Sequence, residues 1–318
     1  MVNHIFSRFY NPYIFSKLVP LIAKPSAMIH VATVHWNTDR WVDLQLNQLN
    51  RYIHQPFRVY AFLSGEAAKQ RSKYFYSSCQ PITEHAVKLN LLAETIMLLA
   101  QSDEDPLIFI DGDAFPVTPL DDFIGMQLER YPLAAVQRLE NVGDIQPHPS
   151  FCLTTVGFWK SISGDWLKGY EWTNSRGVKR TDVGGNLLKI LNDLGVEWKP
   201  LLRTGQLSEH PLMFGIYENA IYHHGAGFRQ PLSMYDRLKP TSHVVKNKAV
   251  AGGIDLVLDK LPLKNRFFLQ RHLGLKKNIL RQNVELSEAI YHDFASIISK
   301  GEAYDFISKS RRFPVTGS

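Results

Sequence analysis

Two aspartates follow directly after an apolar run, and no other stretch of the sequence constrains the fold as much. The stretch "IFIDGDAFPV" covers residues 108–117 and places Asp111 and Asp113 around Gly112. The apolar residues before the pair are typical of a short strand that is covered on both faces. An unpaired charge is costly at the end of such a strand. The two carboxylates are therefore expected to have a partner.

The segments before this strand alternate between strand and helix patterns. Residues 29–36 and 57–65 read as apolar strands, and residues 39–53 and 83–100 place apolar side chains at helical spacing. Such alternation indicates a mainly parallel sheet with crossover helices, in which functional loops gather at the carboxyl ends of the strands. We expect an α/β fold with Asp111 at that functional edge.

A hard cation is the partner that suits two neighbouring carboxylates. Strand side chains alternate, so Asp111 and Asp113 project to the same side if the chain stays extended through Gly112, and both can then reach one Mn²⁺ or Mg²⁺ ion. Gly112 also leaves room for a ligand to approach the backbone. The alternative is a solvated turn, because Asp and Gly are both turn formers.

Further polar residues are candidates for the same site. His224 is the expected third metal ligand, and the adjacent His223 is its rival. Lys88, on the helix before the carboxylate strand, is expected to contact phosphates, and its alternative is a solvated helix lysine. Asn37, just past the first strand, is a candidate contact to a base or ribose.

Several stretches resemble glycosyltransferases of the GT-A fold, whose D-x-D motif follows a strand and holds a divalent metal on a nucleotide-sugar diphosphate. The later stretches are loosely similar to the family 8 transferases and follow their order along residues 28–231. The stretch "FCLTTVGFW" is similar to the strand that builds their donor-sugar pocket and keeps its glycine as Gly157. The stretch "TDVGGNLL" resembles another of their motifs at Asp182 only, which would place this carboxylate near the reacting sugar.

The stretch "HGAGFRQP" matches a late family motif, His-x-x-Gly-x-x-Lys-Pro, at His224, Gly227 and Pro231. Gln230 stands where the motif has its lysine, and Arg229 is the neighbour that carries a positive charge. The second strand also lacks the acidic residue that often contacts the base in this family.

The resemblance implies a Rossmann-like GT-A fold and a metal-dependent, hexosyltransferase-like enzyme. Its donor would be a nucleotide-diphosphate sugar, with a UDP-sugar expected, and its acceptor a hydroxyl of a glycan or another molecule. Asp182 would act as a general base in an inverting reaction, or lie beside the anomeric carbon in a retaining one. The alternative for Asp182 is a cap on a helix that begins at Val183. Trp36, Phe158 and Trp159 either stack in the pocket or belong to the core, and core is expected for two of them.

Two other functions fit parts of the same pattern. An apolar-Asp-x-Asp stretch also describes the nucleophile and acid of haloacid dehalogenase-type phosphatases, although Phe115 stands where these enzymes have Thr or Val. The other alternative is a lipid- or nucleic-acid-binding protein without catalysis, which can have a metal site and a basic face.

Composition bears on the ends of the chain and on its surroundings. The 318 residues carry a net charge of +6, which favours anionic partners, and two cysteines, which indicate a reducing compartment. We expect a basic and aromatic arm over residues 1–27, a catalytic domain over 28–236, and a basic, mainly helical region over 237–318.

The two basic ends of the chain are expected either to pack on the catalytic domain or to contact an anionic membrane surface, while nucleic acid is not an expected partner. The predicted location is cytoplasmic, with peripheral contact to the inner face of a membrane as an option.

Overall fold

The computed structural model describes residues 27–225 except 142, 175–176, 209 and 211, and then residues 260–262, 265 and 276–312. Several sequence-based predictions lie outside these ranges. They are the roles of Gly227 and Arg229, the domain boundary near residue 236, almost all of the N-terminal arm, and most of the basic stretch 264–282.

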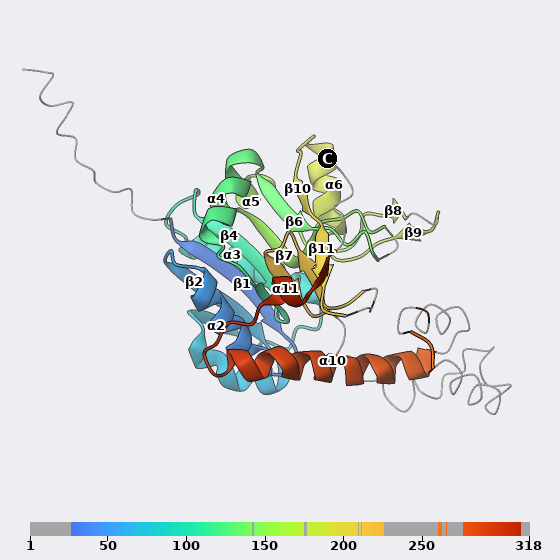
Figure 1. Ribbon diagram of the computed structural model, residues 1–318. Coiled ribbons are helices and arrows are strands. Elements are labelled where there is room, and N and C mark those ends of the chain that lie inside the picture. The colour runs from blue at the N-terminus through green and yellow to red at the C-terminus, as the bar shows by residue number, and fades with distance from the viewer. Residues whose placement is uncertain are drawn as a thin grey trace, which may run out of the picture.

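A central sheet organises the described part of the chain. Its seven strands follow the order β10-β6-β7-β4-β1-β2-β3, and β7 alone among them runs antiparallel to its neighbours (Figure 1). The prediction of an α/β fold with a mostly parallel sheet is therefore confirmed. The strands are β1 (Ile29–His35), β2 (Phe57–Leu63), β3 (Tyr76–Ser78), β4 (Pro106–Asp111), β6 (Leu133–Val136), β7 (His148–Thr155) and β10 (Lys199–Leu201).

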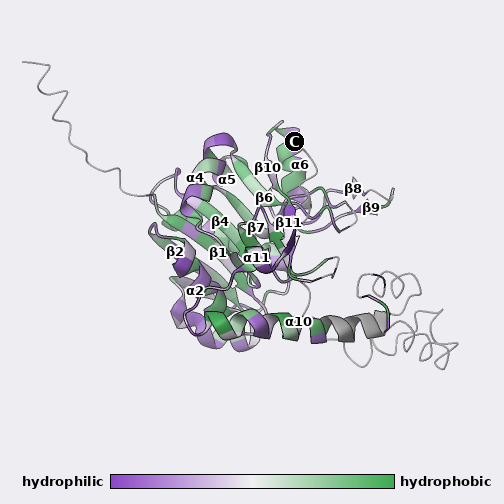
Figure 2. Ribbon diagram, in the orientation of Figure 1, coloured by the Kyte–Doolittle hydropathy of each residue, from purple (hydrophilic) through white to green (hydrophobic). Residues whose placement is uncertain are grey.

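Helices cover both faces of this sheet, and each face has its own core. In the strands, which are the apolar part of the ribbon in Figure 2, alternate side chains point to opposite faces. Ile108 and Ile110 of β4 belong to one core, and Phe109 belongs to the other, where it packs on Trp159 and Trp166. The first core lies under α2 (Val42–Tyr52) and α4 (Asp121–Arg130), and the second under α3 (His85–Leu99), α5 (Val156–Ser161) and α6 (Gly185–Asp193).

A second, antiparallel sheet begins where β4 ends. Its five described strands follow the order β14-β11-β12-β13-β5. The pairing of β13 with β5 sets His223 opposite Ala114, directly after the two aspartates. The strands are β5 (Ala114–Pro116), β11 (Arg203–Gln206), β12 (Gly215–Tyr217), β13 (Ile221–His223) and β14 (Arg311–Arg312), and β8 (Trp172–Thr173) with β9 (Lys179–Arg180) forms a separate ribbon.

The described C-terminal elements pack on this body. Helix α10 (Lys276–Ile298) crosses α2, where Glu288 accepts two hydrogen bonds from Arg40 at 2.9 and 3.0 Å (Figure 1). Phe294 of α10 and Phe306 of α11 (Phe306–Lys309) join Phe115 in an aromatic core beneath the second sheet. None of the helices in the described ranges combines the length and the apolar character that crossing a bilayer requires.

Candidate functional site

The two aspartates lie on a turn between the two sheets. Strand β4 ends at Asp111, the chain turns at Gly112 and Asp113, and β5 begins at Ala114. The chain therefore does not stay extended through Gly112, which was the condition for the alternation argument, and it forms a turn in which Asp111 and Asp113 are partly buried. A Cβ atom on Gly112 would lie 2.6 Å from the Val34 carbonyl oxygen. The close passage of β1 thus accounts for this glycine, which sequence analysis assigned to an approaching ligand.

A buried glutamine holds this turn in place. The side chain of Gln45 on α2 is fully buried, and its Nε2 donates to the carbonyl oxygens of Asp111 at 2.8 Å and Ala114 at 2.7 Å. Its Oε1 accepts from the Thr33 hydroxyl at 3.1 Å and from His35 Nε2 at 3.2 Å. The amide therefore uses both donors and both acceptor positions, and the turn is fixed from the α2 face of the sheet.

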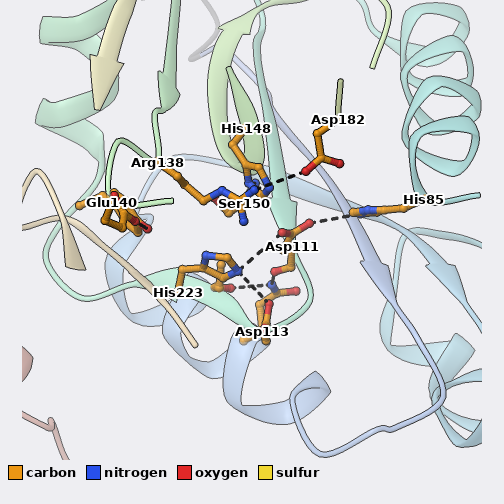
Figure 3. A network of polar contacts seen from close by, with 12 residues as sticks. His85, Asp111, Asp113, Arg138, Glu140, His148, Ser150, Asp182 and His223 are labelled. Carbon is orange, nitrogen blue, oxygen red and sulfur yellow. Dashed lines mark hydrogen bonds and ion pairs between the residues drawn. The ribbon is translucent and has the colours of Figure 1, made fainter. Parts of the chain in front are cut away.

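Three side chains converge at the turn. His223 Nε2 lies 3.5 Å from Asp113 Oδ1 and 3.7 Å from Asp111 Oδ2 (Figure 3). One ligand atom from each of these residues falls within 4.8 Å of the other two. The pairing of β13 with β5, extended by a hydrogen bond from His224 N to Asp113 O at 3.1 Å, brings the histidine to the carboxylates.

His223, and not the expected His224, is the histidine of this cluster. Consecutive residues along β13 point to opposite sides, so His224 turns away from the site toward the core that Tyr222 also enters. Its ring packs 4.7 Å from Trp41, and the Tyr222 hydroxyl lies 2.9 Å from its Nδ1. Burial in this aromatic core lowers the pKa of His224 to about 3. We therefore correct the sequence-based choice between the two histidines.

Burial and mutual attraction set the charges of the cluster. Burial opposes charge on Asp113, but the nearby His223 outweighs it, so the pKa of Asp113 is lowered. Burial likewise opposes charge on His223, and its attraction to Asp113 raises the pKa of His223. Burial raises the pKa of Asp111, against the opposing influence of His85 and His223. These opposite shifts favour an ion pair between Asp113 and His223, with Asp111 beside them.

Helix α3 contributes one residue that the sequence did not single out. His85, the first residue of α3, places Nε2 3.2 Å from Asp111 Oδ1 (Figure 3). Lys88 lies one turn further along and is 2% exposed, with its ammonium 5.7 Å from the centroid of the Phe62 ring. Burial lowers the pKa of Lys88. The alternative of a solvated lysine is therefore wrong, and phosphate contact by Lys88 stays a prediction.

Asp182 faces an arginine at the same edge of the sheet. Its Oδ2 lies 3.7 Å from a terminal nitrogen of Arg138, which follows β6, and Figure 3 shows both side chains beside His148. Its Oδ1 accepts a hydrogen bond from Val183 N at 2.9 Å. Helix α6 begins only at Gly185, and Gly184 occupies its cap position with φ 89°. The alternative that Asp182 caps a helix beginning at Val183 is therefore wrong, and the role of Asp182 in the reaction stays a prediction.

A shell of buried polar atoms adjoins the site. Within the described residues, five of these side-chain atoms have no hydrogen-bond partner: Arg138 Nε, Asp144 Oδ1, Gln146 Nε2, Gln146 Oε1 and Ser150 Oγ. Asp144 also lies 3.5 Å from Arg138, and a Cβ atom on Gly184, two residues after Asp182, would lie 3.6 Å from the Gln146 side chain. Buried polar groups of this kind usually have a hydrogen-bond partner, so these atoms can bind a polar ligand or water.

The remaining predicted residues are divided between the two edges of the sheet. Because β7 runs antiparallel to β4, Thr155 pairs with Pro106, and Gly157 donates its N–H to Asp103 O at 2.8 Å. Gly157 therefore lies at the amino end of β4, opposite Asp111, and its expected place in a sugar pocket is wrong. Asn37 follows the carboxyl end of β1, at the same edge as Asp111, and is exposed.

The three candidate aromatic residues also separate. Trp36 lies at the carboxyl edge, beside Asn37, and is 64% exposed. Trp159 is fully buried in the core under α3, and Phe158 packs against that core. As expected, two of the three belong to the core.

The chain is similar to known proteins in its fold alone. No protein-family model matches the chain, and no curated protein matches it in sequence. Among solved structures the chain is similar to glycosyltransferases, as the sequence motifs are. GlyE of Streptococcus pneumoniae TIGR4 has a TM-score of 0.31 and 15% identity over 43% of this chain and 36% of its own.

Two further glycosyltransferases match to a similar degree. The bifunctional enzyme WbbM has a TM-score of 0.33 and 13% identity over 58% of this chain and 40% of its own. Mouse xyloside xylosyltransferase 1 has a TM-score of 0.27 and 11% identity over 42% of this chain and 68% of its own. The match thus spans less than half the length of GlyE and WbbM. Similarity at this level does not identify the reaction, so the chemistry is inferred from the residues of the site.

The buried His35 makes the stability of the protein depend on pH. Burial lowers the pKa of His35 from its ordinary 6.5 to about 4. The imidazole takes up a proton near pH 6.5 in the unfolded chain and only near pH 4 in the folded protein. The contribution of His35 to stability is therefore fully present above pH 6.5 and is lost as the pH falls toward 4.

Urea unfolding of the wild type should show a loss of about 2 kcal/mol from this group between pH 7 and pH 5. In His35→Gln, which keeps a donor toward Gln45 but does not titrate, the loss should be smaller by about that amount; an equal loss in both proteins would contradict this assignment.

Replacing the glutamine that holds the turn should be costly. Gln45→Leu leaves the carbonyl oxygens of Asp111 and Ala114 without their donor, and we expect the free energy of unfolding to fall by roughly 2–5 kcal/mol in urea titrations. The control is Gln70→Leu, because Gln70 Nε2 donates to an Asp39 side-chain oxygen at 3.0 Å in a partly buried position away from the turn. A Gln45→Leu protein as stable as this control would show that the turn does not depend on the amide.

Proposed function

We propose that this protein is a metal-dependent glycosyltransferase that transfers a sugar from a nucleotide-diphosphate donor to a hydroxyl acceptor. The observation that carries the proposal is the convergence of Asp111, Asp113 and His223 at the carboxyl edge of the central sheet, beside the shell of unsatisfied polar groups. This edge is where open α/β sheets bind their ligands.

The carboxylate and histidine cluster suits a divalent ion. It offers two oxygen ligands and one nitrogen ligand, and the distances of 3.5 and 3.7 Å between the histidine nitrogen and the carboxylate oxygens approach the spacing of about 3 Å between adjacent ligands of an octahedral ion. A mixed set of carboxylates and imidazole favours Mn²⁺, with Mg²⁺ as the harder alternative. When bound, the ion would stabilise the negative charge that the departing nucleoside diphosphate gains.

The polar shell suits a sugar. A hydroxyl group donates one hydrogen bond and accepts two, so a ligand with several hydroxyls can satisfy donors and acceptors together. Arg138 and Ser150 offer donors, Asp144 offers an acceptor, and the amide of Gln146 offers both. Arg138 lies 3.5 Å from Asp144 and 3.7 Å from Asp182, which supports a sugar site beside these residues.

The nucleotide has candidate contacts on the other side of the aspartates. The exposed ring of Trp36, which follows β1, is available for stacking on a base. The exposed Asn37 stays our candidate for a contact to base or ribose. We infer that the buried Lys88 contributes positive charge toward the diphosphate of a UDP-sugar. The roles of Gly227 and Arg229 in phosphate binding, and contact of the basic ends with an anionic membrane, stay predictions from the sequence.

Asp182 is the residue that we assign to the reacting carbon. In the transfer, the acceptor oxygen forms a bond to the anomeric carbon, the bond from that carbon to the phosphate oxygen breaks, and the diphosphate leaves with the electron pair. Asp182 would accept the acceptor proton in an inverting reaction. In a retaining one it would stabilise the anomeric carbon, and the departing diphosphate oxygen would accept that proton. Arg138, 3.7 Å away, holds the orientation of Asp182.

Loss of either aspartate of the cluster should abolish donor turnover. The assay incubates the full chain with Mn²⁺ and a panel of nucleotide sugars and measures the nucleoside diphosphate released. Asp111→Asn and Asp113→Asn should each lower release by roughly 100-fold or more, because each removes a charged metal ligand. The control is Asp103→Asn, since Asp103 is exposed at the opposite edge of the sheet.

Three outcomes of this assay would contradict the proposal. One is full release after EDTA treatment, and another is full release from both aspartate variants. The third is hydrolysis of simple phosphomonoesters in preference to every nucleotide sugar, which would instead support the phosphatase alternative.

Replacing Asp182 should separate catalysis from binding. We expect Asp182→Asn to lower kcat by roughly 100- to 10,000-fold, the range for a general base, while the KM for the donor and the affinity for Mn²⁺ change little. Asp193→Asn is the matched control, because Asp193 lies on α6 with its side chain 60% exposed. A kcat for Asp182→Asn near that of the control would contradict a role of Asp182 in the reaction.

A further inference from the structure

The carboxylate of Asp111 lies between two histidines, and both contacts are ion-pair distances, because its buried Oδ1 makes no hydrogen bond within the described residues. Its Oδ1 lies 3.2 Å from His85 Nε2, and its Oδ2 lies 3.7 Å from His223 Nε2 (Figure 3). The two rings come from distant segments, α3 and β13. Asp111 is the last residue of β4, and its odd-numbered position along that strand places it on the α3 face, where His85 begins the helix.

The contact with His85 determines which oxygen faces the cluster. The terminal torsion of an aspartate is broad, so the carboxylate rotates unless its oxygens have partners. His223 lies between Asp111 and Asp113 and contacts both. A partner for Oδ1 on the opposite side therefore keeps Oδ2 directed at His223 and Asp113.

The fold of α3 does not require His85. Its side chain is 34% exposed, and Asp111 is its one polar or ionic partner within the described residues. The helix packs through other side chains, which are Ala86, Lys88, Leu89, Leu92, Ala93 and Ile96. Because His85 is not needed for packing and its partner is a buried carboxylate, we expect it to have a role in the site.

We propose that His85 is a positioning residue of the metal cluster, which holds Asp111 Oδ1 so that Oδ2 stays in place beside Asp113 and His223. The inference rests on the proposed function only in taking the cluster as a divalent metal site. Partners that orient metal ligands typically contribute 10- to 100-fold to metal affinity, and this is the effect expected of His85.

The test measures the affinity of the full chain for Mn²⁺ alone, from the electron paramagnetic resonance signal of unbound Mn²⁺. His85→Leu should raise the Kd by roughly 10- to 100-fold. His85→Gln, whose side-chain amide nitrogen can take the place of Nε2 beside Asp111 Oδ1, should stay within about threefold of the wild type. The thermal midpoint of the metal-free protein should be the same for all three.

The matched control is His54→Leu. Like His85, His54 pairs with one aspartate, with Nδ1 2.8 Å from Asp121 Oδ2 at the start of α4, and its side chain is more exposed. Its replacement should leave the Kd for Mn²⁺ unchanged.

Each other outcome overturns the inference. If the wild type binds Mn²⁺ and His85→Leu binds it equally well, His85 does not position Asp111, and the proposed function is untouched. If His85→Gln binds as weakly as His85→Leu, the ring is needed as a ligand and not as a partner of Asp111 Oδ1. If the wild type does not bind Mn²⁺, both this inference and the metal dependence of the proposed function are wrong.

Discussion

The site depends on one buried amide. Gln45 connects the first strand to the turn after β4, because its oxygen accepts from Thr33 and His35 while its nitrogen donates to the backbone on both sides of the aspartates. Hydrogen bonds to main-chain carbonyls fix the path of the chain, so the positions of Asp111 and Asp113 follow from the position of α2. The side chains of the two aspartates face histidines instead: His85 of α3, on the other face of the sheet, and His223 of β13. Backbone and side chains of the cluster are thus held by separate sets of residues.

The junction between the two sheets explains why the cluster contains both acids and a histidine. Strand β4 of the central sheet ends at Asp111, and β5 of the antiparallel sheet begins three residues later. Because β13 pairs with β5, it runs next to the turn and brings His223 to the aspartates. The attraction between His223 and Asp113 lowers the pKa of the aspartate and raises that of the histidine, which reduces the cost of burying two carboxylates. A divalent cation in the same place would neutralise both carboxylates.

The sequence was sufficient for the strands and helices that lead to the aspartates, because buried parallel strands and amphipathic helices have strong patterns. It was insufficient for features that depend on pairing between distant segments. The reversed direction of β7, which moved Gly157 to the opposite edge, is set by tertiary contacts that leave no local signal. Alternation along β13 separates His223 from His224, but it does not indicate which faces the site. His85 and the polar shell around Arg138 belong to no motif, and only the folded chain brings them to Asp111.

The aromatic core under the second sheet has a consequence for folding during synthesis. Phe115 and Tyr222 are covered by Phe294 and Phe306, which the ribosome adds about 70 residues or more after Tyr222. Until that late segment is synthesised, Phe115 and Tyr222 lack the aromatic contacts that Phe294 and Phe306 make with them in the folded protein. A chaperone that recognises aromatic side chains would therefore find its binding window between the translation of β13 and that of α11.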